Sequence, residues 1–245
     1  MTTRGSFNPY SFFINVYSKA FQFTETPFLC NFARNLVFMK LIQELNKHIK
    51  VDAEIERFLN EECETKVFEK GEILSKQNQY NHTVFFVDEG LLRMFYYENG
   101  KDITTNFYSE GKITANIDTL FKNQPTRNNI ETLEKSVITT CNFNKLEELC
   151  SVSLTAANFS RYILGNLMIE MSRRISSLQY MTAKEKYIQL LEENPNIILR
   201  APLAMIASYL GISQETLSRH FSEINIFFSL ESFSSQLLNT LNIAN

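Results

Sequence analysis

Short apolar runs separated by turn residues restrict the fold of this sequence more than any other feature. The runs occupy residues 65–143, and a glycine-containing turn follows several of them. The Asn99-Gly100 pair is the strongest turn signal, because a type I′ hairpin turn requires positive φ at both of its central residues. Apolar runs that alternate with turns roughly every ten residues predict a compact antiparallel sandwich or barrel over this region.

Helical periodicity flanks this β region on both sides. Residues 39 to about 63 place apolar side chains at helical spacing. Residues 154 to about 179 lack proline, and apolar residues spaced alternately by four and three form a short heptad seam. The seam residues are Leu164, Met168, Met171, Ile175 and Leu178. The helix either lies on its own domain or pairs with a second copy of the chain, and its position between a β region and a helical region favours pairing.

A capping-box pattern predicts a further helix after the seam. Thr182 is the expected N-cap residue, and Glu185 is the third residue of the helix. Because the residue before a proline is disfavoured in a helix, this helix is expected to end at Asn194-Pro195.

Residues 201–219 have the pattern of two short helices joined by a tight turn. Ile206 and Leu210 form an apolar stripe on the first helix. Gly211 permits the left-handed backbone of a tight turn, and Ser213 can cap the second helix through its hydroxyl. An alanine, a glycine four residues later and then a capped helix together match the helix-turn-helix motif.

The second helix of this motif exposes side chains that can read DNA. Glutamine can pair with adenine, glutamate can accept a hydrogen bond from cytosine, and arginine can bind guanine or a phosphate. The first-turn amides and a serine hydroxyl suit a phosphate. The predicted DNA-binding residues are Ser213, Gln214, Glu215, Thr216, Ser218 and Arg219. The alternative is that these residues are only the solvated face of a surface helix.

Through residues 213–219, the chain resembles the catabolite-activator/fumarate-nitrate-regulator (Crp/Fnr) family. The resemblance covers about residues 39–219 and extends to motifs in the β region. These motifs are Glu69–Leu74, Phe86–Arg93, Asn99–Lys101 and Phe107–Tyr108. The resemblance implies an α+β fold with an N-terminal antiparallel β-roll (jelly-roll) sensor domain, a long dimerisation helix and a C-terminal helix-turn-helix domain. By match, Gln214, Glu215 and Arg219 take the family's base-reading positions.

The motifs and the resemblance together divide the chain into five parts. The expected parts are an extension foreign to the fold at 1–38, a cyclic-nucleotide-binding-like β-roll at 39–150, a dimerisation helix at 151–180, a helix-turn-helix domain at 181–221 and a divergent tail at 222–245.

One departure from the family concerns the effector. Family members that bind a cyclic nucleotide hold its ribose with a Gly-Glu pair and its phosphate with an arginine about ten residues later. Ala115-Asn116 stands where Gly-Glu is expected. Arg127 matches the arginine only through a gap, so it is the one candidate ligand-binding residue, with a simple surface residue as the alternative. The sequence therefore argues against cyclic AMP and leaves the effector unknown.

The cysteines and histidines argue against a metal site or an enzyme. The four cysteines include no CxxC pair, and the three histidines are scattered, so we expect reduced thiols, no metal and no resident cofactor. No nucleophile triad, glycine-rich phosphate loop or paired-carboxylate motif stands out. With no apolar run of about 18 residues and no leader pattern, we expect a cytoplasmic protein that makes no membrane contact.

The charge balance leaves two functions open. Residues 194–245 hold only two arginines against three glutamates, whereas a DNA-binding domain usually neutralises several phosphates. The leading hypothesis is a homodimeric transcription regulator that binds double-stranded DNA, responds to a small-molecule effector in the roll and contacts RNA polymerase. The alternative is a ligand-binding and dimerisation sensor whose DNA binding is weak.

Overall fold

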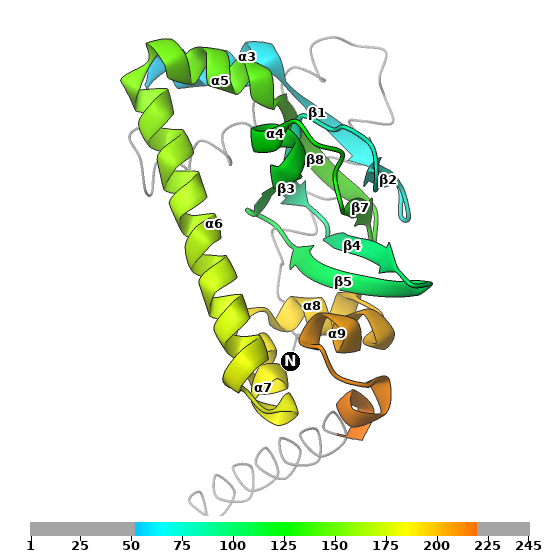
Figure 1. Ribbon diagram of the computed structural model, residues 1–245. Helices are drawn as coiled ribbons and strands as arrows, with labels where there is room; N and C mark the ends of the chain where they lie inside the picture. The colour runs from blue at the N-terminus through cyan, green and yellow to red at the C-terminus, as the bar shows by residue number, and fades with distance from the viewer. Residues whose placement is uncertain (1–51, 220–245) are drawn as a thin grey trace, which may run out of the picture.

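The computed structural model describes residues 52–219, which form a β-roll, a long helix and a small helical head (Figure 1). The expectations for the extension at 1–38, for the helical stretch at 39–51 and for the tail at 222–245 lie outside the described residues. The final part of the first predicted helix is present as α3 (Ala53–Glu62). The Asp52 side chain caps α3 by accepting a hydrogen bond of 3.0 Å from the Ile55 N–H.

Two four-stranded antiparallel sheets form the roll, as expected from the spacing of the turns. The first sheet has the order β1 (Cys63–Phe68), β8 (Ser136–Asn142), β3 (Thr83–Glu89) and β6 (Ile113–Ala115). The second has the order β2 (Ile73–Ser75), β7 (Asn129–Thr132), β4 (Leu92–Glu98) and β5 (Lys101–Tyr108). A short helix, α4 (Ile117–Lys122), follows β6.

The β4–β5 hairpin confirms the strongest turn signal of the sequence. Asn99 and Gly100 have φ values of 51° and 74°, and Glu98 pairs with Lys101 across the turn. Positive φ at both central residues is the requirement of a type I′ turn, whose twist matches that of the flanking strands.

The first sheet buries both of its faces. Successive residues of β3 point to opposite faces, so Phe85 faces the second sheet while Phe86 faces the helices. The inner cluster is Phe85, Val87, Leu92, Met94, Tyr108, Ile130 and Ile138. The outer cluster is Ile55, Phe58, Leu59, Cys63, Phe86, Ala156 and Phe159. The outer cluster joins the sheet to α3 and to the start of α6 (Leu154–Tyr180), and the half-buried Leu146 and Leu149 of α5 (Phe143–Val152) pack against it.

The long helix α6 has 27 residues. Its two ends lie within one residue of those predicted for the seam helix, 154 and about 179. At 1.5 Å per residue it is about 40 Å long. It begins at the outer cluster beside α3 and α5, and it ends beside the helical head (Figure 1). It therefore connects the two ends of the molecule.

The helical head contains α7 (Ala183–Glu193), α8 (Pro195–Arg200), α9 (Leu203–Leu210) and a helical segment over 214–219. Both hydrogen bonds of the capping box between Thr182 and Glu185 are present, and α7 ends before Asn194, as predicted. The head and the roll share one apolar cluster, in which Leu91 and Leu133 of the roll meet the head. The head residues of this cluster are Tyr187, Leu190, Ile197, Ala201, Ile206, Ala207, Leu210 and Leu217.

The expectation that the cysteines are reduced thiols is wrong for two of them. Cys63 and Cys141 form a disulfide, although 78 positions separate them in the sequence. The cause is strand register: β1 and β8 pair antiparallel with Cys63 directly opposite Cys141. Linear spacing does not show this register. Cys150 is a free, half-buried thiol.

The close approach of β8 to the end of β3 makes Gly90 sensitive to substitution. Gly90 has φ +106°, and a Cβ there would lie 2.2 Å from the Ser136 Oγ and 2.8 Å from its Cα. We expect Gly90→Ala to lower the free energy of unfolding by at least about 2 kcal/mol, through backbone strain and overlap.

Gly165 provides the matched control, because it lies in α6 and a Cβ there would meet nothing within 4 Å. Gly165→Ala should raise the free energy of unfolding by up to about 1 kcal/mol, through better helix propensity. Urea titrations of both variants measure the difference, and equal stabilities would contradict this account of the β3–β8 contact.

Candidate nucleic-acid interface and its link to the sensor roll

The turn before the 214–219 helix is built around Gly211. Gly211 has φ +67°, which is the left-handed conformation expected from the sequence. Its N–H donates to the Ser208 carbonyl at 3.1 Å, and the Ile212 N–H donates to the Ala207 carbonyl at 3.1 Å. These bonds satisfy the last carbonyls of α9, so the chain reverses at the end of the helix with its backbone groups paired.

Ser213 begins the second helix as predicted. The Thr216 N–H donates to the Ser213 Oγ at 3.2 Å, and the Leu217 N–H donates to the Ser213 carbonyl at 3.0 Å. The two hydroxyls of Ser213 and Thr216 lie 3.1 Å apart. The Ser213 hydroxyl therefore caps the helix, and the Thr216 hydroxyl bonds to it at the N-terminal end of the helix.

The predicted base-reading side chains lie together on one exposed face. Gln214, Glu215, Ser218 and Arg219 are exposed, Thr216 is half-buried and Leu217 is fully buried. The pKa of Glu215 lies below its usual value, because its carboxylate accepts hydrogen bonds from its own backbone N–H and from Ser213. The face at neutral pH thus combines one anion, one cation and two neutral polar groups.

Arg200 joins the head to the roll by ion pairs that the sequence does not indicate. Its guanidinium lies 2.9 Å from the Glu110 carboxylate and 2.5 Å from the Glu134 carboxylate. Burial by itself would raise the pKa of Glu110, but hydrogen bonds from Arg200 and from backbone N–H groups outweigh it and lower that pKa. Because Arg200 is occupied by two carboxylates, it does not offer its charge to a phosphate.

Contacts around Tyr209 and Ser208 in α9 reinforce this link. The Thr104 N–H of β5 donates to the Ser208 Oγ at 2.9 Å, and the Phe107 and Tyr209 rings meet edge to face at 5.4 Å. The Arg174 guanidinium of α6 lies 4.0 Å from the Tyr209 ring centroid and hydrogen-bonds the Tyr209 carbonyl. The head therefore contacts both the roll and the long helix through α9.

Arg127, the one candidate ligand-binding residue, lies on the outside of the roll. Its side chain is 64% exposed and lies 3.5 Å from the Glu98 carboxylate. Its guanidinium carbon also lies 4.9 Å from the Tyr96 ring centroid. The structure thus gives Arg127 two surface partners from β4.

Asn116 lies where the family pattern has glutamate. Asn116 is buried before α4, and its Nδ2 donates to the Ser75 Oγ at 2.7 Å. The nearby Thr114 is also buried. The segment just before α4 therefore presents amide and hydroxyl groups where the family pattern has a carboxylate.

An apolar cavity of about 70 Å³ lies outside the roll interior, at the edge of the first sheet. Ala115, Ile117 and Phe121 line it from β6 and α4, and Phe159 and Ile163 line it from α6. Its lining suits an apolar group and offers no charged side chain.

Across residues 52–219, no cluster of three or more histidine, cysteine, aspartate or glutamate residues is arranged to hold a metal ion. Over the same residues, every helix is too short or too polar to cross a membrane.

Residues 65–153 match the model of the cyclic nucleotide-binding domain family. No curated protein sequence matches the chain. Among solved structures, FixK2 from Bradyrhizobium japonicum aligns with a TM-score of 0.59 and 19% identity, covering 67% of this chain and 85% of FixK2.

Two further solved structures align with most of the chain. A transcriptional regulator described as a Crp/Fnr-family protein from Eubacterium rectale aligns with a TM-score of 0.58 and 16% identity, covering 72% of this chain and 84% of that one. The c-di-GMP-responsive regulator CLP from Xanthomonas campestris aligns with a TM-score of 0.57 and 16% identity, covering 71% and 92%. The chain shares the fold of these structures.

This fold confirms the α+β architecture that the resemblance implies, in which a region matching the cyclic nucleotide-binding domain family precedes the long helix and the helical head. At identities of 16–19%, these structural alignments show the fold alone and assign no role to single residues.

The ion pairs of Arg200 predict a pH-dependent link between head and roll. Folding lowers the pKa of Glu110. Its contribution to the free energy of unfolding is therefore complete above the unfolded glutamate pKa of about 4.3, and it is lost as pH falls through the pKa of Glu110 in the folded protein. We expect Arg200→Met to lower the free energy of unfolding by about 1 to 3 kcal/mol at pH 7 and by less at pH 3.5.

Arg127→Met is the control, because it removes an exposed ion pair with Glu98 in which no residue of the head takes part. It should change the free energy of unfolding by less than about 1 kcal/mol at both pH values. Thermal and urea unfolding at the two pH values test the link. A loss for Arg200→Met that is equal at both pH values would contradict the role assigned to its carboxylate partners.

Proposed function

We propose that the chain is a homodimeric transcription regulator that reads double-stranded DNA with the helix beginning after Ser213. One observation carries the proposal. Leu217 is fully buried while Gln214, Glu215, Ser218 and Arg219 are exposed together, as a helix in the major groove requires. In such a groove, the amide of Gln214 can pair with adenine, and Arg219 can bind guanine or a phosphate.

The exposed seam of α6 supports pairing of two chains. Met168, Met171, Ile175 and Leu178 are 72%, 61%, 52% and 44% exposed in the single chain. Apolar side chains at heptad spacing are buried most completely when they pack against a second helix. A Cβ added at Gly211 would lie 3.4 Å from Leu178, so the end of the seam adjoins the turn before the reading helix. Pairing through α6 would thus set the spacing of two heads.

The link between roll and head supports control by an effector. The head shares the apolar cluster with Leu91 and Leu133 of the roll, and Arg200 holds Glu110 and Glu134. A ligand that favours one arrangement of this contact would shift the population of heads able to bind DNA. The polar groups of Asn116 and Thr114 and the surface placement of Arg127 favour an effector other than cyclic AMP. A contact with RNA polymerase stays a prediction.

A second candidate is a ligand-binding and dimerisation sensor with weak DNA binding. The observation that favours it is charge: Arg200 is occupied by Glu110 and Glu134, which leaves few cations in the head to neutralise phosphates. The two candidates differ in the salt dependence and sequence preference of DNA binding.

The first prediction for this function concerns the reading face. With a duplex enriched from the native genome, Gln214→Ala and Arg219→Ala should each weaken binding by about 5- to 150-fold, because a specific base contact contributes about 1 to 3 kcal/mol. Fluorescence anisotropy at several salt concentrations measures the affinities. Arg219→Ala should also lower the salt dependence if it neutralises a phosphate.

Arg161→Ala is the control for this experiment, because Arg161 is an exposed cation on α6, where it hydrogen-bonds Asn158. It should leave the affinity unchanged within about twofold, as expected for a charge outside the DNA interface. Equal losses for all three variants, or no binding by the full chain at low salt, would favour the sensor without useful DNA binding.

The second prediction concerns the seam. Met171→Glu and Ile175→Glu should convert a dimer into a monomer, because a buried carboxylate without a partner opposes pairing. Leu199→Glu, at a side chain that is 84% exposed on α8, should leave the dimer intact. Sedimentation of the three variants gives the masses. A dimer that survives both seam variants would exclude α6 as the interface.

A further inference from the structure

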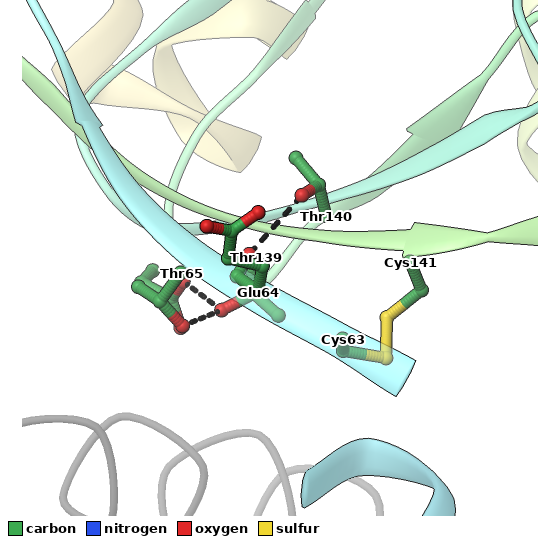
Figure 2. Close-up of a disulfide and its surroundings, with 7 residues drawn as sticks. Cys63, Glu64, Thr65, Thr139, Thr140 and Cys141 are labelled. Carbon is green, nitrogen blue, oxygen red and sulfur yellow. Dashed lines mark hydrogen bonds between the residues drawn. A yellow bond between two sulfur atoms is a disulfide. The ribbon is translucent and has the colours of Figure 1, made fainter. Parts of the chain in front are cut away.

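We propose that Cys63 and Cys141 form a reversible thiol–disulfide site, through which a low-molecular-weight dithiol controls how firmly α3 holds the base of α6. The site lies at the end of the β1–β8 ladder, far along α6 from the reading helix (Figures 1 and 2). Any consequence for DNA binding rests on the proposed function, whereas the exchange reaction and its local effect do not.

Strand register alone brings the two sulfur atoms together. The Cα atoms of Cys63 and Cys141 are 4.4 Å apart, which is the separation of a non-hydrogen-bonded antiparallel pair. The next rungs of the ladder have bonds of their own. The Thr140 Oγ1 donates to the Glu64 carbonyl at 3.1 Å (Figure 2). The sheet therefore has contacts that keep β1 and β8 paired when the disulfide opens.

The two cysteines differ in exposure. Cys63 is 2% exposed, while Cys141 is half-buried. A small thiol can therefore approach the bond from the side of Cys141, while Cys63 stays in the apolar cluster. This asymmetry suits a small dithiol better than a large protein surface.

The disulfide lies where three helices meet the sheet. Cys63 is the C-cap residue of α3, and Cys141 lies two residues before Phe143, the first residue of α5. Cys63 belongs to the same apolar cluster as Ala156 and Phe159 in the first turns of α6. The bond therefore cross-links the end of α3 to β8, within the apolar cluster that also contains the first turns of α6.

The reaction is a two-electron exchange. A dithiol supplies two electrons and two protons, the bond between the two Sγ atoms breaks, Cys63 and Cys141 become thiols, and the dithiol closes into its own disulfide. The reverse reaction restores the bond. When the bond is open, α3 loses its covalent cross-link to β8 and keeps its apolar contacts and the hydrogen bond between Asp52 and Thr155, so local opening of α3 and of the first turns of α6 becomes easier.

A third cysteine nearby does not compete with this pair. Cys150 packs against the same cluster, and burial together with the charge of Glu147 raises the pKa of its thiol. A thiol with a raised pKa forms little thiolate at neutral pH, and the thiolate is the attacking species. Cys150 therefore serves as an internal control for thiol reactivity.

Equilibration of the full chain with mixtures of oxidised and reduced dithiothreitol tests the proposal. After alkylation and peptide mapping, Cys63 and Cys141 should become modified together, and the change should reverse on reoxidation. Amide hydrogen exchange in α3 and the first two turns of α6 should then rise by about tenfold, while exchange in β3 stays unchanged. Two free thiols in the oxidised buffer, unchanged exchange in α3, or loss of protection across the whole roll would each overturn the proposal.

Two variants complete the experiment. Cys141→Ser should show the fast amide exchange of the reduced wild-type chain in both buffers. Cys150→Ser should show slow amide exchange in the oxidised buffer and fast amide exchange in the reduced buffer, as the wild-type chain does. If Cys141→Ser does not fold, the reduced wild-type chain supplies the same comparison. No readout here involves DNA, so a failure of the disulfide site is distinct from a failure of the proposed regulator function.

Discussion

The exposure of the proposed DNA-reading face depends on the burial of Leu217. Leu217 is fully buried in the cluster that also contains Leu210 and Ile206. On a helix, a buried residue at one position sends its neighbours on the opposite face into solvent. The orientation of Gln214 and Arg219 therefore follows from one apolar anchor, and Gly211 provides the turn that lets this anchor reach the cluster.

The same cluster extends from the head into the roll. In the proposed regulator, this continuity is the route by which a change in the roll reaches the head. Leu91 and Leu133 come from turns of the roll, yet they pack in one cluster with residues of the head. Arg200 adds ion pairs to two carboxylates of the roll at the rim of this cluster. Packed interiors shift between discrete arrangements more readily than they deform, so a change in the roll can move the head as a unit.

Local sequence signals predicted the local structure well. The Asn99-Gly100 turn, the Thr182–Glu185 capping box and the turn at Gly211 each depend on a few neighbouring residues, and each is present as expected. The long-range contacts were not predictable in this way. The pairing of Arg200 with Glu110 and Glu134, and of Cys63 with Cys141, depends on strand register and domain contact. The spacing of cysteines along the sequence does not show which distant residues meet, so the sequence predicts separate thiols where the structure has a disulfide.

The most direct test of the central claim is selection of bound fragments from the native genome by the full chain, followed by sequencing. If paired reading helices present Gln214 and Arg219 outward, the enriched fragments share a two-fold symmetric site whose half-sites lie about one helical turn, or 34 Å, apart. Fragments without a shared symmetric site, or no enrichment at low ionic strength, would contradict the claim.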